Sequence, residues 1–262
     1  MDLLNHALRA GHEPGATPAA RRHGTWLAGG GGALGSAVLE ALLGARVFAP
    51  LRVLVTQDFH ATARGLHTQR LETLAQATDA RLPLAVVVFD VPRRANGREA
   101  AFWQPPPAEL KPLATTLLGL CVRHLIVVMP HTSATLPEAL KAGLASLDEQ
   151  AVAALGFEHV AIVRTAQRPD EAPRPGLQRL ADAVLEQLRV MVPQREQPVR
   201  PVKVAQLVAA LARALPASAA GTRVMSPEWV WQAAQGADPH ALVQAWLDGA
   251  PLPQAALPRQ RM

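Results

Sequence analysis

Unbroken apolar runs separated by helical segments are the feature of this 262-residue chain that most restricts its fold. Strands buried on both faces of a parallel sheet read as continuous apolar runs, whereas strands with one face in water alternate. The segments between the runs repeat apolar residues at helical spacing, as in residues 33–43 and 137–155. This alternation predicts an α/β fold, a Rossmann-type doubly wound parallel sheet. Its strands are expected at residues 25–28, 51–56, 84–90, 124–129 and 159–164, with a weaker one near 66–71.

The pattern changes after Thr165, where prolines interrupt the chain. The following residues predict a helix over 177–190, a second over 202–215, a short strand over 222–225, and a helix capped by Ser226. The expected organisation is a loose arm (1–22), the Rossmann domain (23–165), a small and mostly helical C-terminal part that closes over the carboxyl ends of the strands (166–250), and a tail (251–262).

Charge and composition narrow the classes of partner. The net charge is +5 and the isoelectric point about 10.5, but the basic residues are scattered and aromatic residues make up only 4% of the chain. This pattern is typical of a solvated surface and argues against nucleic-acid binding. No apolar stretch reaches the roughly 20 residues of a membrane helix, and residues 1–22 lack the apolar centre of a secretion signal. A cytoplasmic protein is expected, and the sequence gives no indication of its oligomeric state.

Histidine and cysteine form no recognisable sequence signature. The nine histidines include no HExxH motif and no paired ligand spacing, so no metal site is predicted. Cys121 lies in the apolar segment GLCVRHLIVV and is expected to be buried as a small hydrophobic residue.

A glycine run between the first strand and the first helix is the clearest functional motif. It satisfies both G-x-G-x-x-G (30–35) and G-x-x-G-x-x-G (29–35). In such a loop one glycine allows the turn out of the strand, another lets the backbone approach a pyrophosphate, and the last lets the helix pack on the sheet. The pyrophosphate then meets the free N–H groups of the helix N-terminus. The motif predicts dinucleotide binding, with a plain turn in a nucleotide-free domain as the alternative. The binding residues are Gly29, Gly30, Gly31, Gly32, Ala33, Leu34 and Gly35.

Further cofactor contacts are expected at the ends of three other strands. Gln57 and Asp58 follow the second strand, about 20 residues beyond the loop, where an acid accepts hydrogen bonds from the adenine ribose and repels a 2′-phosphate. NAD is therefore predicted in preference to NADP, although Asp58 could instead cap a helix over residues 59–65. Ligands of such sheets bind where the strand order reverses, so Asp90, Val91 and Met129 are also expected to line the site.

These motifs together resemble the short-chain dehydrogenase/reductase superfamily, and within it the atypical, NmrA-like or nucleoside-diphosphate-sugar-epimerase-like branch. AGGGGALG (28–35) resembles the family's TGATGxxG loop, and residues 86–103 its fourth strand and cofactor-lining loop. Residues 122–134 resemble its fifth strand with a Ser/Thr-rich end, and residues 147–165 the helix and strand that end in "lgf..l.IvRP". The resemblance covers residues 25–164 well and the remainder loosely. It implies an NAD(P) cofactor and oxidoreductase or epimerase chemistry.

The acid/base pair of the resembled family has no counterpart. In that family the tyrosine of a Tyr-x-x-x-Lys pair moves the proton, and the lysine lowers its pKa and holds the nicotinamide ribose. Counted back from Arg164, the two positions fall on Lys141 and Ala145, and the chain contains no tyrosine. Hydride transfer to a carbonyl needs a proton donor close by. The remaining candidates are His131, Thr132, Ser133 and Lys141.

Three functional hypotheses follow. The missing pair favours a catalytically degenerate dinucleotide-binding protein, a pseudoenzyme that acts as a cofactor sensor or scaffold. The second hypothesis is an active NAD(P)-dependent oxidoreductase or epimerase-like enzyme in which His131 or a water replaces the tyrosine. The third is a structural protein that binds no nucleotide.

Overall fold

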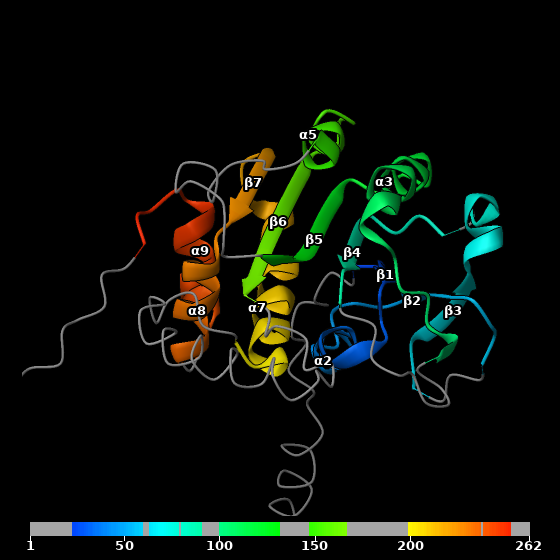
Figure 1. Ribbon diagram of the computed structural model, residues 1–262, viewed down its shortest axis with the longest axis horizontal. Coiled ribbons are helices and arrows are strands. Elements are labelled where there is room, and N and C mark those ends of the chain that lie inside the picture. Colours follow the sequence, from blue (N-terminus) through cyan, green and yellow to red (C-terminus); the bar gives the residue numbers. More distant parts are fainter. Residues whose placement is uncertain are drawn as a thin grey trace, which may run out of the picture.

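A seven-stranded, entirely parallel sheet organises the computed structural model (Figure 1). The structure describes residues 23–59, 63–78, 80–90, 100–131, 147–166, 199–236 and 238–252, apart from the side chain of His131. The elements are β1 (Thr25–Ala28), α2 (Gly32–Gly44), β2 (Leu51–Val55), β3 (Leu66–Arg70), η1 (Leu71–Gln76), β4 (Leu84–Val88), η3 (Pro107–Glu109), α3 (Leu110–Gly119), β5 (His124–His131), α5 (Leu147–Ala153), β6 (His159–Ala166), α7 (Pro201–Ala214), η6 (Leu215–Ala217), β7 (Gly221–Met225), α8 (Pro227–Gln235) and α9 (His240–Leu247).

The strand order confirms the predicted doubly wound fold. It runs β3-β2-β1-β4-β5-β6-β7, so the chain first moves outward from β1 through β2 and β3. It then returns to pair β4 with the other side of β1 and continues in the opposite direction. The loops that leave β1 and β4 therefore diverge, which makes the carboxyl ends of these two strands the topological switch point of the sheet.

Successive residues of each strand point to opposite faces of the sheet and so belong to two separate hydrophobic cores. Leu27, Val53 and Val86 face the core shared with α2, α7, α8 and α9. Trp26 and Val87, from the alternate positions, face the core shared with α3, α5 and η1. Both faces of the sheet are thus covered, which explains why the central parts of the inner strands β4, β5 and β6 are unbroken apolar runs.

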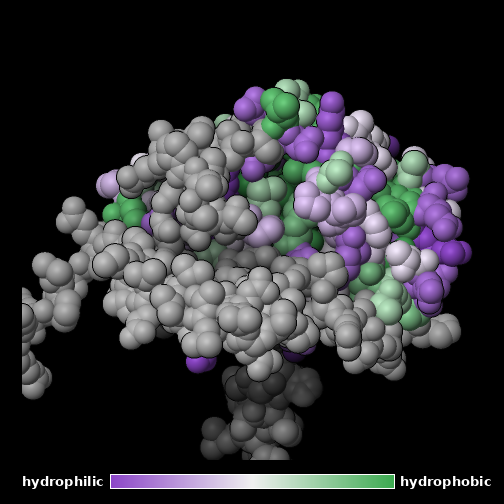
Figure 2. Space-filling view, in the orientation of Figure 1, coloured by the Kyte–Doolittle hydropathy of each residue, from purple (hydrophilic) through white to green (hydrophobic). Residues whose placement is uncertain are grey.

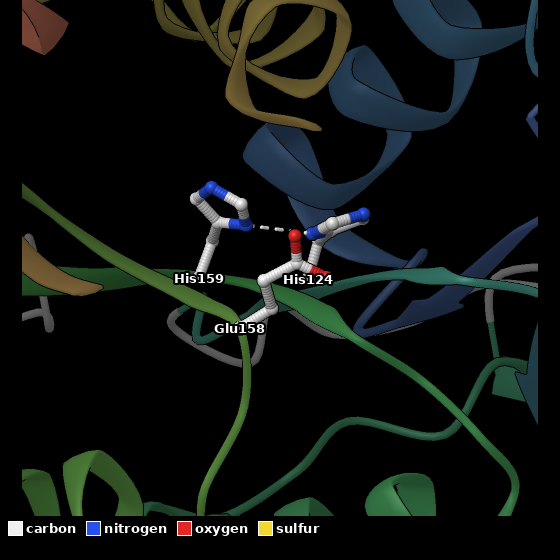
Figure 3. A group of neighbouring side chains, drawn as sticks. All are labelled: His124, Glu158 and His159. Carbon is white, nitrogen blue, oxygen red and sulfur yellow. Dashed lines mark hydrogen bonds between the residues drawn. The ribbon is translucent and has the colours of Figure 1, made fainter. Parts of the chain in front are cut away.

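The strand register also aligns polar residues at the opposite, amino edge of the sheet. His124 begins β5 and is paired in register with His159, which begins β6. Both side chains are buried and face each other (Figure 3). Parallel strands of similar sequence, HLIVV and HVAIV, thereby bring two histidines together that lie 35 positions apart.

The C-terminal part differs from its predicted placement. Its described residues add β7 to the sheet edge, beside β6, and pack α7 against α2. Buried residues of α7, α8 and α9 belong to the same core as α2, so these helices cover a face of the sheet. In the described ranges this part therefore does not close over the carboxyl ends of the strands. The apolar faces of these helices favour the sheet because it offers the larger apolar surface.

Several element predictions are confirmed within a residue or two, and others are incomplete. The weak strand near residue 66 is present as β3, and Pro227 starts α8 after Ser226, whose side chain makes no capping hydrogen bond. Helices α3 and α9 were not predicted. Of the helix expected over 137–155, the structure describes α5, and the arm 1–22, the helix 177–190 and tail residues 253–262 lie outside the described residues.

The visible surface is polar around β3 and η1 and carries an apolar area over α5 (Figure 2). Leu147, in α5, is 82% exposed. Within the described ranges, no helix combines the length and the apolar character that crossing a bilayer would require.

Candidate functional site

Two glycines bring the first turn of α2 directly onto the sheet. Gly29 leaves β1 with φ +80°, and its N–H donates to the carbonyl of Trp103 at 3.1 Å. A Cβ at Gly29 would overlap the carbonyl oxygen of Val88 at the end of β4. A Cβ at Gly35, on α2, would overlap the carbonyl oxygen of Gly29. Only glycine permits this approach, so the predicted use of the first and last glycines for the turn and for helix–sheet packing is confirmed.

The N-terminus of α2 is capped by the carboxylate of Asp90, a residue far away in the sequence. Gly31 occupies the N-cap and offers no side chain, while Gly32 adopts φ +76°. The backbone N–H of Leu34 donates to Oδ2 of Asp90 at 2.7 Å. A Cβ at Gly32 would lie 2.6 Å from the same oxygen. The carboxylate thus sits against the loop backbone and interacts favourably with the positive end of the helix.

This contact places Asp90 where the sequence predicted a phosphate. A helix N-terminus binds an anion through its free N–H groups, and here one of those groups is already bonded to Asp90. A dinucleotide phosphate and the Asp90 carboxylate would compete for the same donors and repel each other. The sequence predicted Asp90 at the site but not this hydrogen bond, because the two partners are 56 positions apart.

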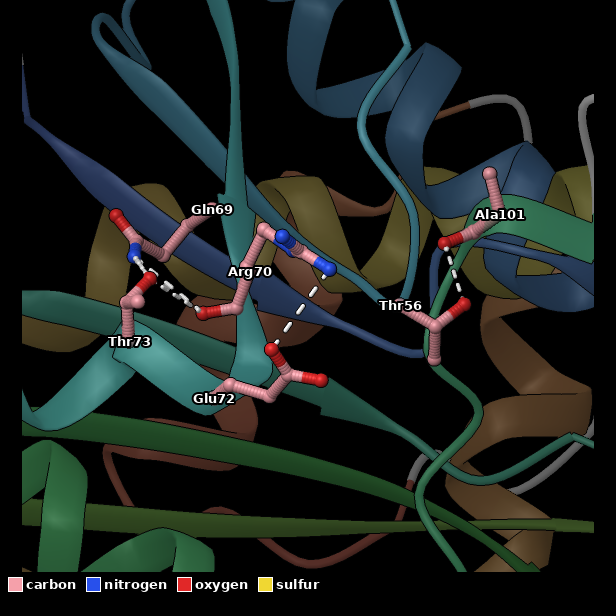
Figure 4. A network of polar contacts seen from close by, with 6 residues as sticks. All are labelled: Thr56, Gln69, Arg70, Glu72, Thr73 and Ala101. Atoms are coloured by element: carbon pink, nitrogen blue, oxygen red, sulfur yellow. Dashed lines mark hydrogen bonds and ion pairs between the residues drawn. The ribbon is translucent and has the colours of Figure 1, made fainter.

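Residues 100–103, which follow the residues 91–99 that the structure does not describe, cross the carboxyl ends of β1 and β2. Phe102 forms an antiparallel bridge with Val55, and Thr56 donates through both its N–H and its hydroxyl to the carbonyl of Ala101 (Figure 4). The Phe102 ring approaches Phe59 edge to face at 5.1 Å. It also covers Gly30, where an added Cβ would lie 3.2 Å from the ring. An aromatic wall therefore borders the loop on the β2 side.

The remaining predicted cofactor residues are placed in part. Gln57 and Asp58 are exposed after β2, and within the described part of residues 56–70 the chain forms no helix for Asp58 to cap. Met129 is half-buried near the end of β5, and its carbonyl accepts a hydrogen bond from the Thr165 hydroxyl. Val91 lies outside the described residues.

The candidate acid/base residues are not described in contact with the loop. The backbone of His131 ends β5 opposite Ala166, at the same edge of the sheet as the glycine loop. Thr132, Ser133, Lys141 and Ala145 lie outside the described residues.

A buried ion pair joins α5 to β6 and was not predicted. Nη2 of Arg164 lies 2.8 Å from Oε2 of Glu149, and the two side chains are 3% and 5% exposed. Arg164 is a charged residue in an otherwise apolar strand, and this was the signal in the sequence. A buried charge requires a partner, but the sequence did not indicate which acid supplies it.

Cys121 is exposed, contrary to the prediction that it is buried. It lies in a turn just after the end of α3 and has φ +64°, so it does not belong to a strand or helix that would bury it. It borders an open pocket of about 380 Å³ that is also lined by Arg123 and Glu158.

Glu158 belongs to a polar cluster with the two buried histidines. Nδ1 of His124 lies 2.9 Å from Nδ1 of His159, and Nε2 of His159 lies 3.1 Å from the carbonyl oxygen of Ser218. Burial, and then the neighbouring His159, lower the pKa of His124 from 6.5 to about 4. Glu158 acts in the opposite direction, and Arg123 and His23 lower this pKa further.

The protein is expected to lose stability as the pH falls below about 6.5, the ordinary pKa of histidine. The unfolded chain binds a proton at His124 below that pH, whereas the folded chain resists it until about pH 4. Between these values the unfolded state holds more protons, so acidification favours unfolding by on the order of 1–2 kcal/mol between pH 7 and pH 5. Urea unfolding at both pH values measures this loss. His124→Asn should show a smaller loss, and equal losses in the two proteins would contradict the assignment.

Comparisons with known proteins give no match among protein-family models or among curated proteins. The similar solved structures include the uronate dehydrogenase of Agrobacterium tumefaciens, at 12% identity and a TM-score of 0.48, covering 89% of this chain and 92% of that one. They also include the UDP-Glc/GlcNAc 4-epimerase of Campylobacter jejuni, at 12% identity and a TM-score of 0.46 (80% and 82% covered). A short-chain dehydrogenase of Leptospira borgpetersenii with bound NAD⁺ has 7% identity and a TM-score of 0.45 (80% and 93% covered). The Rossmann-type fold itself rests on the sheet topology.

Proposed function

We propose that this chain binds NAD(H) between the glycine loop (Gly29–Gly35) and the carboxyl ends of β1 and β4, and that it acts as a dinucleotide sensor or scaffold. The close contact of Gly29 and Gly35 with the sheet backbone is the observation that carries the proposal. It holds the first turn of α2 against the end of β1, so the backbone N–H groups of the helix start lie at the switch point of the sheet, where ligands of such sheets bind. A loop that served only as a turn would need one such glycine.

The residues present fit a dinucleotide in three respects. The loop backbone and the N-terminus of α2 suit a pyrophosphate. The aromatic wall of Phe59 and Phe102 borders the loop on the β2 side and suits a flat apolar ring. Asp58 is exposed after β2, where its charge would disfavour the 2′-phosphate of NADP. When bound, the nicotinamide group would supply hydride chemistry.

The proposed lack of turnover rests on the amino-acid sequence. No tyrosine is present to exchange a proton with a carbonyl oxygen, and Ala145 occupies the position of the lysine in the resembled family. A chain with this loop and without that pair would bind the cofactor without the usual partner for its hydride. Occupancy would then change the state of the site, which is what a sensor or a stabilised scaffold requires.

Asp90 is the group that opposes binding. Its carboxylate already accepts the Leu34 N–H, so we propose that it withdraws when the pyrophosphate binds. In the free protein the Asp90 carboxylate would then occupy the place of the phosphate at the glycine loop. This competition would weaken nucleotide binding, so that occupancy would respond to changes in nucleotide concentration.

NAD⁺ and NADH, more than NADP⁺ and NADPH, are expected to raise the melting temperature of the protein. A ligand that binds only the folded state stabilises it by about 2.7 kcal/mol at a hundredfold excess over its Kd. Asp90→Asn should bind NAD(H) about tenfold more tightly, because it keeps an oxygen for Leu34 and loses the charge that repels phosphate. Thermal unfolding with each of the four nucleotides, followed by calorimetric titration, measures both effects.

Asp238→Asn is the matched control, since Asp238 also accepts a backbone N–H at a helix start, from His240 at 2.9 Å. This variant should leave nucleotide affinity unchanged. If no nucleotide stabilises either the parent protein or Asp90→Asn, the dinucleotide proposal is wrong. If the nucleotides bind and the two aspartate variants behave alike, the opposing role of Asp90 is wrong while the site stands.

A further inference from the structure

Three metal-ligating side chains converge at the amino edge of the sheet, opposite the glycine loop. His124 and His159 begin neighbouring strands, and Glu158 immediately precedes the second of them. One ligand atom from each residue lies within 4.8 Å of those of the other two. Figure 3 shows the Glu158 carboxylate extending toward the gap between the two rings.

The hydrogen bonds of His159 fix which of its nitrogens is available. A carbonyl oxygen can only accept, so Nε2 of His159 carries a hydrogen and donates it to Ser218. Neutral imidazole has one N–H, so Nδ1 of His159 presents a lone pair toward His124. In the metal-free protein, Nδ1 of His124 donates into that lone pair at 2.9 Å.

This arrangement is the one that metal-binding histidines adopt. Their second ring nitrogen usually donates to a backbone carbonyl or a carboxylate, which fixes the ring orientation and the tautomer. His159 already has this support from Ser218, before any metal is bound. If His124 moves its hydrogen from Nδ1 to Nε2, the two Nδ1 atoms offer neighbouring lone pairs, and rotation of the two rings turns both toward one ion.

We propose that His124, His159 and Glu158 form a binding site for a divalent transition-metal ion of the Zn²⁺ type. Two imidazole nitrogens bound to one Zn²⁺ at about 2.0–2.1 Å in tetrahedral geometry lie about 3.3 Å apart. The observed 2.9 Å separation therefore needs to widen by only a few tenths of an ångström. Two imidazoles and one carboxylate suit Zn²⁺ better than Mg²⁺ or Ca²⁺, which prefer all-oxygen sites.

The site is open to solvent on the side of Glu158. The two histidines are 7% and 1% exposed, whereas Glu158 lines the open pocket beside Cys121. Solvent can therefore supply the ion and a water ligand from this side. The same edge joins β5, β6 and the segment that leads to β7, because the Glu158 carbonyl accepts the N–H of Gly221 at 2.9 Å.

Arg123 competes with the ion for Glu158. Nη2 of Arg123 lies 2.9 Å from Oε2 of Glu158, and the arginine side chain is 68% exposed. Exposed ion pairs contribute little to stability, so a doubly charged ion held by two further ligands can displace this guanidinium. Removing the arginine should therefore strengthen metal binding.

The experiment uses the full chain without an affinity tag, stripped with a chelator, in a Cys121→Ser background that removes the exposed thiol. Co²⁺ is titrated by its visible d–d absorption, and Zn²⁺ by competition with a chromophoric chelator. One ion per chain is expected. Glu158→Gln should weaken Zn²⁺ binding at least about tenfold, since the loss of a second-shell partner alone costs that much. Arg123→Gln should tighten it.

His159→Asn tests a buried ligand, and its folding is checked by circular dichroism at the same temperature. His67→Gln, on the exposed side of β3, is the control for binding by surface histidines and should not change the affinity. The proposal is overturned if no ion binds, or if binding persists unchanged in Glu158→Gln. A Co²⁺ spectrum that is the same in Glu158→Gln and in the parent also overturns it, whether or not His159→Asn folds.

Discussion

Glu149→Gln is expected to lower the free energy of unfolding by about 3–5 kcal/mol, the cost of leaving one charge of a buried pair without its partner. Glu149 lies on α5 and Arg164 on β6, with 2.8 Å between their charged groups and almost no exposure of either side chain. Glutamine keeps the shape and one oxygen but not the charge, so the buried guanidinium loses the negative charge 2.8 Å away. Urea unfolding at neutral pH measures the loss.

An exposed ion pair of the same chain supplies the control for this prediction. Arg70 and Glu72 lie 3.7 Å apart with side chains 46% and 76% exposed (Figure 4). Glu72→Gln should change stability by less than about 0.5 kcal/mol. The double variant Glu149→Leu/Arg164→Met should be more stable than Glu149→Gln, because apolar side chains replace both charges. If Glu149→Gln costs no more than Glu72→Gln, the pair does not stabilise the fold.

The strands of this fold could be predicted from the sequence because burial on both faces leaves a direct record in the residues. The runs around Val87 and Ile126 contain no polar residue that would mark a solvent face, and Arg52 is the one polar residue within β2. Helix α3 was missed because its sequence does not show its burial so directly. It is short and follows three prolines, and its buried residues, among them Leu113 and Leu117, are interrupted by threonines.

The glycine loop could be predicted because its requirement is local, whereas the contacts around it depend on tertiary structure. The turn, the positive φ of Gly29 and the packing of Gly35 all follow from a motif of seven residues. The hydrogen bond from Leu34 to Asp90 and the Phe102 wall depend on how the segment after β4 returns to β1 and β2. No spacing rule along the chain encodes that return.

The histidine cluster is a case in which the sequence held a usable signal. A search for ligands a few positions apart fails, since His124 and His159 are 35 positions apart. Both, however, stand directly before apolar runs that are adjacent in a parallel sheet. Parallel strands that start with the same residue type bring those residues side by side whenever the register matches. The amino ends of the strands can therefore form a site of their own, separate from the one at the carboxyl ends.

The second large effect is expected at the other edge, where Gly35→Ala should destabilise the protein by about 2–4 kcal/mol, in the range found for overpacking against unyielding neighbours. An added Cβ would overlap the carbonyl oxygen of Gly29 and would lie 3.0–3.1 Å from the backbone carbons of Gly29 and Gly30. Backbone atoms cannot rotate away as a flexible side chain can. The first turn of α2 would have to move off β1, and with it the N–H groups that we propose bind the pyrophosphate.

Gly44→Ala at the far end of α2 separates this steric cost from the intrinsic preference of the helix. A Cβ there meets no atom within 4 Å, so alanine should stabilise the protein by up to about 1 kcal/mol through helix propensity. Urea unfolding of the two variants should therefore shift in opposite directions. Equal shifts would mean that α2 does not depend on the close approach at Gly35. NAD(H) binding that survived a destabilising Gly35→Ala would place the nucleotide elsewhere, because the same displacement that costs stability must also move the start of α2.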